Sequence, residues 1–264
     1  MPDTPMSTDP VSRFAPIVAK HRGGSFLQGD MLSALKLHVQ GNLSIIWAPF
    51  DHVLATAKLV VVGITPGAVQ AENALAAFRN ALQSGLPPAE ASRRAKLAGS
   101  FSGPMRDNLV AMLNHVGAPR ALGVASFADV FSPTRECVHF TSALRYPVFV
   151  NGKNYNGAPN MIRTADLRRV VETHLAAEAR ALPDAIWLPL GRKPVAALLH
   201  LVRLGVLDGR QVVEGFPHPS GENGERIAYF TERKPRSALS VKTPPASIDA
   251  AREALRAQFA RLAA

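Results

Sequence analysis

The sequence predicts an α/β protein, a three-layer α/β/α sandwich built around a four-stranded parallel sheet. Two observations support this class. Four short apolar segments rich in β-branched residues, typical of buried strands, are separated by segments with helical periodicity. Strands that alternate with helices along a chain pair in parallel and are covered by helices on both faces.

The expected strands are short and almost free of charge. They cover residues 59–62, 138–141, 185–190 and 212–216. Between and after them, apolar residues recur at intervals of three and four, as on the buried face of a helix. These stripes consist of Leu75, Phe78 and Leu82; Leu109, Met112, Leu113 and Val116; Leu167, Val170, Val171 and Leu175; and Leu255, Phe259 and Leu262.

The composition also indicates how the chain is organised. Residues 1–25 mix Asp, Pro, Ser, Arg and Lys, so we expect a flexible N-terminal arm followed by a single domain over residues 26–264. No apolar run approaches the ~20 residues needed to span a bilayer, and the first residues lack a signal-peptide pattern. We therefore expect a cytoplasmic protein that makes no membrane contact.

Cysteine content and charge narrow the function classes. The single cysteine, Cys137, rules out an intrachain disulfide and a cysteine-ligated metal cluster, and we interpret it as a small apolar residue at the start of a strand. The formal net charge of +10 suits a polyanionic partner such as nucleic acid. We expect a monomer that binds no metal and no cofactor.

Each expected strand runs directly into a polar or glycine-containing turn. These turns cover residues 63–67, 142–145, 191–194 and 217–220. The carboxyl ends of parallel strands lie at one edge of the sheet, where ligand sites are built. The sequence therefore predicts one site formed by four segments that are distant along the chain.

The residues of the first turn determine how closely its backbone can approach a ligand and how rigid the turn is. Gly63 and Gly67 allow close approach of the backbone to a flat ligand, and Pro66 stiffens the loop. A phosphate-binding loop is excluded because no Gly-Lys-Ser/Thr follows, and a dinucleotide fingerprint because its third glycine is missing. Taken alone, the motif is a weak signal and more often marks a plain turn after a strand.

The last turn holds His218 between Pro217 and Pro219, so its backbone is restrained on both sides. A lone histidine more often has a structural role. The two prolines, the position at the end of a strand and the following Ser-Gly-Glu-Asn favour a functional one, in which the imidazole stabilises negative charge on a leaving group. The other seven histidines show no metal-ligand spacing.

Together, Gly63-Ile64-Thr65-Pro66-Gly67 after a buried strand and His218-Pro219-Ser220 after the last strand resemble the uracil-DNA glycosylase superfamily. In that superfamily the first motif positions water, and the second supplies a histidine beside the base carbonyl and a loop that probes DNA. The superfamily fold is a four-stranded parallel sheet between helices. The resemblance extends from about residue 59 to residue 229, with identity confined to short motifs.

Two intermediate segments also resemble this superfamily. Ser100-Phe101-Ser102-Gly103 is similar to a segment of its iron–sulfur branch, which implies that Phe101 stacks on uracil; an ordinary core phenylalanine is the alternative. The segment 141–145 resembles the strand end that reads the base edge. The chain departs from the pattern at Thr65, where relatives carry Asp or Asn, and at Ser142, where many carry Asn. The cluster cysteines are absent, so the chain resembles a divergent member without an iron–sulfur cluster.

The resemblance implies a monofunctional glycosylase that hydrolyses the N-glycosidic bond of uracil in DNA and starts base excision repair. Other deaminated bases are further expected substrates, because Ser142 would discriminate less sharply than an amide. A uracil-DNA-binding module with little or no turnover, and a nucleoside hydrolase, remain alternatives.

The resemblance also assigns roles to residues. Catalysis falls to His218 and Thr65. The base pocket consists of Gly63, Ile64, Pro66, Gly67, Phe101 and Ser142. The DNA contacts are Ser220, Asn223, Arg226, Arg192 and Lys193.

Some roles stay open. Since Thr65 cannot act as a general base, either leaving-group stabilisation dominates or a carboxylate serves the water, with Asp51, Asp107 and Glu222 as candidates. The basic residues Arg233, Lys234 and Arg236 lie either along the DNA backbone or in a solvated turn, and the same alternative applies to Arg192 and Lys193.

Overall fold

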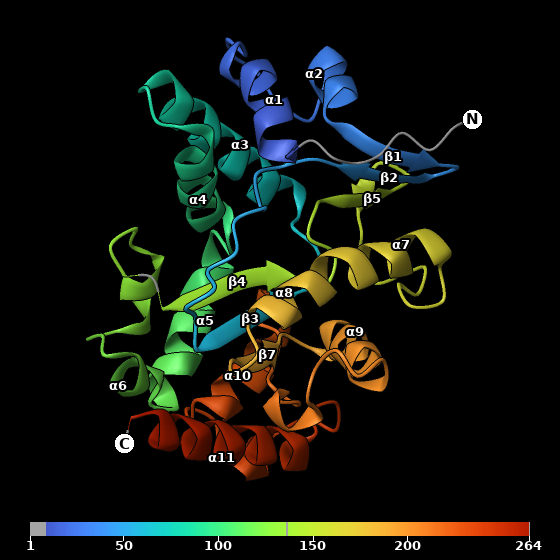
Figure 1. Cartoon of the computed structure of the whole chain (residues 1–264). Helices are drawn as coiled ribbons and strands as arrows, with labels where there is room; N and C mark the ends of the chain where they lie inside the picture. Colours follow the sequence, from blue (N-terminus) through green and yellow to red (C-terminus); the bar gives the residue numbers. More distant parts are fainter. Residues whose placement is uncertain (1–8, 136, 264) are drawn as a thin grey trace. The chain divides into compact units, whose positions relative to one another are not determined.

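The computed structural model describes residues 9–135 and 137–263, and the chain divides into two units (Figure 1). The first unit comprises Met1–His52, Gly67–Ser100 and Tyr146–Tyr155. The second comprises Val53–Pro66, Phe101–Arg145 and Asn156–Ala264. The domain expected over residues 26–264 thus contributes to both units.

The first unit contains an antiparallel sheet that the sequence did not predict. Its strand order is β1-β2-β5-β6. Asn151 and Gly152 connect β5 to β6, and they are residues that two-residue hairpin turns favour. The turn-rich character of this segment is visible in the sequence, whereas its strands are too short to show a period. The strands are β1 (Lys36–Gln40), β2 (Leu43–Ile46), β5 (Val148–Val150) and β6 (Lys153–Asn154).

Helix α1 (Pro10–Ala19) corrects part of the expected flexible arm. Asp9 caps this helix by accepting hydrogen bonds from the backbone N–H groups of Val11 and Ser12. Phe14 is fully buried and stacks on Trp47 with ring centroids 4.6 Å apart. The prediction relied on the polar composition of residues 1–25 and overlooked the buried face of this helix, which is formed by Val11, Phe14, Ala15 and Val18. Residues 1–8 of the expected arm lie outside the described residues.

Three further helices complete the first unit. They are α2 (Gly29–Ala34), α3 (Ala68–Gln83) and α4 (Pro88–Gly99). The predicted stripe on α3 is confirmed at Leu75 and Phe78, both fully buried. Pro88 occupies the first turn of α4, where its missing N–H costs nothing.

The second unit contains the predicted parallel sheet, with three strands in the order β4-β3-β7. These are β4 (Val138–Ser142), β3 (Leu59–Gly63) and β7 (Ile186–Pro189), and the α/β class is confirmed. The expected fourth strand is present only as an isolated parallel bridge between Val212 and Trp187. Farther along this segment, Gly215 adopts φ 90° and Pro217 has no N–H to donate, so neither residue suits a continued strand.

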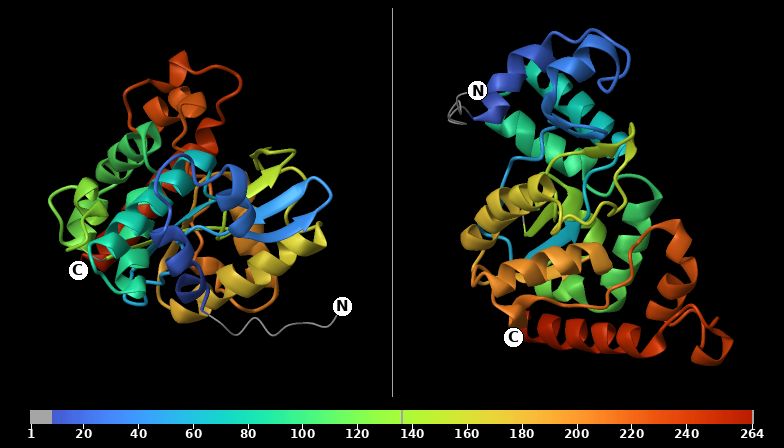
Figure 2. Two further views of the ribbon diagram at one scale, coloured as in Figure 1. Left: turned by 90° about the horizontal axis from the view of Figure 1, so that it is seen from above. Right: turned by 90° about the vertical axis from the view of Figure 1, so that its right-hand side faces the viewer.

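Helices cover both faces of this sheet. Successive side chains of a strand point to opposite faces. On β4, His139 contacts Glu178 of α8 (Ala176–Ala181), whereas Phe140 stacks on Phe131 with ring centroids 4.7 Å apart. In Figure 1 and the right-hand view of Figure 2, α8 accordingly lies on one side of the sheet and α5 (Pro104–His115) on the other.

The remaining helices confirm the predicted stripes. Leu109, Met112 and Leu113 of α5 are fully buried, as is Leu255 of α11 (Pro245–Leu262). None of the described helices combines the length and apolarity needed to cross a membrane. The other helices of the second unit are α6 (Ala118–Leu122), α7 (Ala165–Val170), α9 (Arg192–Arg203), α10 (Gly224–Phe230) and α11 (Pro245–Leu262), with a π-helical turn η2 (Val171–Leu175) between α7 and α8.

Candidate functional site

Three predicted site residues meet where β3 and β4 end. Gly63 and Ser142 are the last residues of these strands and are paired in register. A Cβ atom on Gly63 would lie 3.3 Å from the Ser142 Oγ and 3.4 Å from the Phe101 Cε1. A side chain at position 63 would therefore crowd both groups, and glycine is what lets the hydroxyl and the ring approach the strand end so closely.

Backbone hydrogen bonds continue the pairing of these two strands into their turns. The Ala143 N–H donates to the Gly63 carbonyl at 2.8 Å, and the Leu144 N–H donates to the Ile64 carbonyl at 3.0 Å. Thr65 follows directly and is half-buried. The Gly63–Ile64 backbone is thus held rigidly against the turn that follows Ser142.

The other two members of the glycine loop differ in their surroundings. Pro66 belongs to the second unit and is buried, whereas Gly67 belongs to the first unit and is the N-cap of α3. The Gly67 N–H donates to the Gln70 Oε1 at 3.0 Å, and the next N–H donates to the Asn154 Oδ1 at 2.9 Å. These side chains satisfy the first N–H groups of the helix.

Phe101 has a backbone conformation that is rare for a bulky residue. Its φ angle is 49°, in the left-handed region. Its buried ring makes an edge-to-face contact with Phe140, with centroids 5.8 Å apart. Such a conformation costs roughly 1–3 kcal/mol and occurs preferentially at ligand sites. Phe101 therefore combines a core contact with a position beside Gly63.

Contacts from three segments hold His218 in place. The Ser220 N–H donates to the His218 Nδ1 at 3.2 Å, which leaves the ring proton on Nε2 when the imidazole is neutral. Asn108 of α5 donates from its Nδ2 to the Pro219 carbonyl at 2.9 Å. Gly191, with φ 89°, would place a Cβ 3.5 Å from the His218 Cβ. The sequence did not single out Asn108, which looks like an ordinary polar residue of a helix.

The environment of His218 keeps its imidazole neutral near pH 7. The ring is half-buried, and burial lowers its pKa below the ordinary value of 6.5. The charge of Glu222 opposes this effect and is the smaller influence. The Nε2–H group is therefore a neutral hydrogen-bond donor.

Gly191 follows the third strand at the same edge of the sheet. The Leu190 N–H donates to the Val62 carbonyl at 2.9 Å, so the end of β7 lies beside the end of β3. The edge thus offers a hydroxyl, an aromatic ring and, next to Gly191, an imidazole donor. Such groups suit a flat, polar heterocycle better than a metal ion. Among residues 9–135 and 137–263, no three His, Cys, Asp or Glu side chains gather as a metal site would require.

The segment expected to probe DNA has its own internal order. It forms a 3₁₀ turn, η4 (Gly221–Asn223), that leads into α10. Asn223 donates from its Nδ2 to the Ser220 Oγ at 3.0 Å, and Arg226 donates to the Asn223 Oδ1 at 3.3 Å. Arg226 also donates to the Lys242 carbonyl at 3.0 Å. These three side chains therefore stabilise the turn itself.

The two basic residues at the start of α9, Arg192 and Lys193, are both exposed. The aliphatic part of Lys193 lies against Gly157, where a Cβ would come within 2.8 Å of it. Their exposure leaves both charges in solvent.

The basic segment after α10 is partly occupied by internal contacts. Lys234 forms an ion pair with Glu225 at 2.7 Å, and Arg233 donates from its Nε to the Thr231 Oγ1 at 2.9 Å. The contacts of Glu225 with Lys234, Ser240 and Thr243 hold the pKa of its carboxyl far below the ordinary range. For Lys234 the structural interpretation is therefore favoured over a DNA contact.

The carboxylates considered for water activation occupy different settings. Asp107 and Glu222 are exposed. Asp51 lies in the first unit, where its carboxylate accepts hydrogen bonds from the Trp47 Nε1 and the Tyr146 hydroxyl.

Cys137 precedes β4 as predicted, and burial raises the pKa of its thiol.

A buried ionic network beneath β4 was missed from the sequence. Arg145 donates to the Glu178 Oε1 from Nη2 at 2.6 Å and from Nε at 2.9 Å. His139 lies with its Nε2 at 3.3 Å from the Glu178 Oε2. The side chains of His139 and Glu178 are 1% and 0% exposed, and that of Arg145 is 12% exposed. Because Arg145 follows the turn after Ser142, this network anchors the end of β4.

His174 makes stability depend on pH. Burial, followed by the nearby charge of Arg145, lowers the pKa of His174 from 6.5 to about 4. The unfolded chain therefore binds more protons than the folded chain below pH 6.5, and stability falls as the pH drops from 6.5 towards about 4. When the pH falls from about 7 to about 5, the free energy of unfolding of wild type should drop by about 2 kcal/mol more than that of His174→Gln, which lacks this titrating group. Urea unfolding at both pH values measures the difference, and an unchanged pH dependence would contradict it.

Comparisons with known proteins identify one informative relative. No protein-family model matches this chain, and no solved structure matches it. Over 233 residues the chain is 34% identical to the uncharacterized protein YoxB of Bacillus subtilis (strain 168). The matched region covers 87% of this chain and 91% of that protein. The chain therefore belongs to the same protein family as YoxB.

Proposed function

We propose that this protein is a monofunctional DNA glycosylase of the uracil-DNA glycosylase superfamily that removes uracil without an iron–sulfur cluster. The observation that carries the proposal is the meeting of Gly63, Phe101 and Ser142 at the carboxyl ends of parallel strands. This arrangement provides a close backbone, an aromatic ring and a hydroxyl, the three groups that a flat base with a polar edge requires. The position of His218 beside Gly191 supports the same proposal.

The proposal includes the finer architecture of the superfamily. Residues 212–216 would act as the fourth strand of the parallel sheet. The bridge between Val212 and Trp187, and the hydrogen bond from the Val213 N–H to the Trp187 carbonyl at 2.9 Å, support this assignment. The helices on the two faces would then complete a three-layer sandwich.

The base must leave the DNA helix before it can react, at a cost of roughly a few kcal/mol. Phe101 would stack on the extruded base, and Ser142 would bind its polar edge. A hydroxyl can both donate and accept a hydrogen bond, so Ser142 would accept uracil and the deaminated purines alike.

His218 would stabilise the leaving group. As the N-glycosidic bond breaks, its electron pair moves to the base, and the neutral Nε2–H would donate to the uracil oxygen that gains negative charge. A water molecule adds to C1′ of the sugar and loses a proton to solvent, and the departing uracil anion takes up a proton from solvent. The products are free uracil and an abasic site. The Thr65 hydroxyl would orient this water. None of the grouped side chains is a lysine, so no imine forms and the strand is not cleaved.

Uracil-containing DNA is the proposed partner of a monomeric protein. Arg192 and Lys193 are exposed and would contact phosphates, and the net charge of +10 would attract the polyanion. Ser220 follows His218 and would contact the phosphate beside the extruded nucleotide.

A second candidate function is a module that binds uracil-containing DNA with little or no turnover. It is favoured by one observation: the loop from Gly63 to Pro66 carries Thr65 and no carboxylate that could activate water. In this case the base would be captured without hydrolysis.

An assay with an end-labelled duplex containing one uracil tests these functions. We expect the protein to produce alkali-sensitive abasic sites and free uracil, and to leave a matched thymine duplex intact. Tight binding without abasic product would instead support the binding module. Cleavage of free deoxyuridine without activity on DNA would support a nucleoside hydrolase and overturn the proposal.

A further inference from the structure

A cavity of about 340 Å³ lies in the second unit, formed by the end of α5, by α6 and by the last turns of α11. Its apolar wall includes Val116, Phe259 and Ala260. Its polar wall carries His115, Arg120 and Arg256. The volume lies at the lower end of the range for small-ligand sites.

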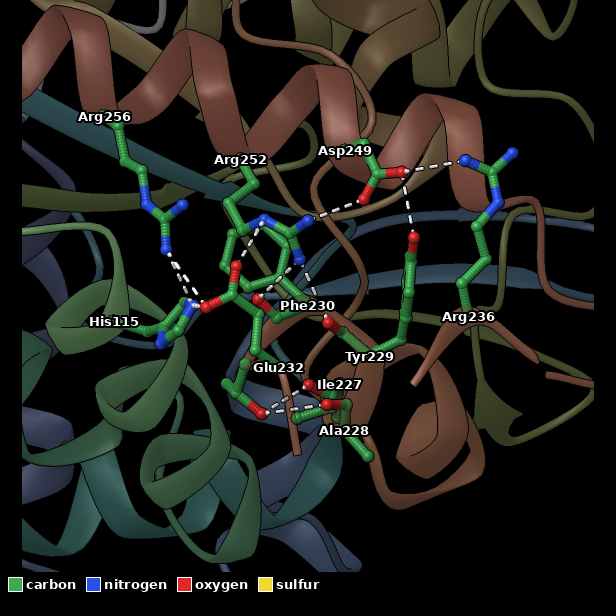
Figure 3. Close-up of polar contacts among 11 residues, drawn as sticks. His115, Ile227, Ala228, Tyr229, Phe230, Glu232, Arg236, Asp249, Arg252 and Arg256 are labelled. Atoms are coloured by element: carbon green, nitrogen blue, oxygen red, sulfur yellow. Dashed lines mark hydrogen bonds and ion pairs between the residues drawn. The ribbon is translucent and has the colours of Figure 1, made fainter. Parts of the chain in front are cut away.

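The guanidinium of Arg256 is held in a fixed position. Its Nη2 lies 3.0 Å from the His115 Nε2 and 3.5 Å from the Glu232 Oε2. Figure 3 shows Arg256 and His115 converging on Glu232, which Arg252 approaches from the other side at 3.5 Å. A guanidinium has five N–H donors, so Arg256 keeps donors for a ligand while its position is set by the protein.

Arg120 supplies a second positive charge from a different helix. Within the part of the chain that the structure describes, its exposed guanidinium has no hydrogen-bonded or ion-paired partner. Arg120 of α6 and Arg256 of α11 therefore border one cavity. All five N–H donors of Arg120 are available to a ligand.

The charge balance around the cavity is positive. Arg252 pairs with Asp249 at 2.7 Å and also approaches Glu232 at 3.5 Å, so the Glu232 carboxylate serves Arg256 together with Arg252. Arg120 adds a further positive charge. Burial lowers the pKa of His115 below its ordinary value, so its ring is neutral near pH 7 and accepts a hydrogen bond from Arg256.

We propose that this cavity binds a small ligand with an anionic head group, a carboxylate or a phosphate, attached to a short apolar body. The head group would lie between Arg120 and Arg256, because arginine donors match the oxygen geometry of both anions. The apolar body would pack on Val116 and Phe259. The site is separate from the strand ends that carry His218, and it does not depend on the function proposed for them.

Isothermal titration calorimetry of the full chain with hexyl phosphate, hexanoate and uncharged hexanol tests the proposal. We expect at least one of the two anions to bind while hexanol does not, and the anion that binds identifies the head group. Arg120→Gln and Arg256→Gln should each weaken binding by about ten-fold or more, because each removes charge-assisted hydrogen bonds. Arg261→Gln is the matched control, since it removes an exposed arginine of α11 that does not line the cavity.

The proposal would be overturned by equal binding of hexanol, by no binding of either anion at millimolar concentration, or by an equal loss in Arg261→Gln. Binding of a single-stranded oligonucleotide that depends on Arg120, without binding of hexyl phosphate or hexanoate, would also overturn it and indicate a nucleic-acid contact. Arg120→Gln decides the outcome if Arg256→Gln is unstable, because Arg120 has no partner among the described residues.

Discussion

The His218→Ala variant is expected to release uracil from DNA about 10²–10³ times more slowly than wild type, in kcat. The reason is the loss of the Nε2–H donor, which the Ser220 N–H holds in the correct tautomer. Substrate binding rests mainly on other groups, so KM should change much less. Single-turnover assays of abasic-site formation measure the effect.

Two further variants distinguish a chemical role of His218 from a structural one. His218→Asn retains a side-chain N–H donor and should recover part of the lost rate. His200→Ala removes a histidine that pairs with Glu172 at 2.7 Å elsewhere in the second unit, and it should keep wild-type activity. Full activity of His218→Ala, or an equal loss in His200→Ala, would contradict the assignment of His218.

The Arg145→Met variant is expected to lose about 3–5 kcal/mol of folding stability. The substitution keeps the apolar length of the side chain and removes the partner of Glu178, whose carboxylate is completely buried. The charge of Glu178 would then remain in the protein interior, beside the His139 imidazole and without its guanidinium partner. Urea unfolding followed by circular dichroism measures the change in the free energy of unfolding.

An exposed ion pair provides the matched control for Arg145. Arg168 lies 3.8 Å from Glu172, with side chains 45% and 39% exposed. Arg168→Met should cost only about 0–1 kcal/mol, because water screens such a pair. A loss in Arg145→Met no larger than that in Arg168→Met would show that the buried network contributes little to stability.

The parallel strands were predictable because each carries a local signal. β3 and β4 are apolar and β-branched and end in a glycine or a serine, so composition alone locates them within about a residue. Strand β1 has the burial pattern of a mostly exposed strand, and β6 has two residues. Neither could be recognised, because short exposed strands have no apolar period.

The candidate site was predicted at the level of its segments. The polar turns after Gly63, Ser142 and Leu190 could be placed at one edge because parallel strands end together. The contacts of Asn108 with Pro219 and of Ser220 with His218 could not be predicted. They depend on side-chain directions that are set by packing between distant segments.

The sequence by itself determined the α/β class, three of the four expected parallel strands and the residues that follow them, because these depend on local apolar period and on glycine and proline chemistry. Only the tertiary structure decided which charges are buried. The sequence places Arg145 in a polar turn at the predicted site and gives no role to Glu178, yet the two side chains meet in the interior at 2.6 Å. This contact depends on how α8 packs against the end of β4. Arg145 and Glu178 are 33 residues apart in the chain, so no local sequence pattern indicates that they meet.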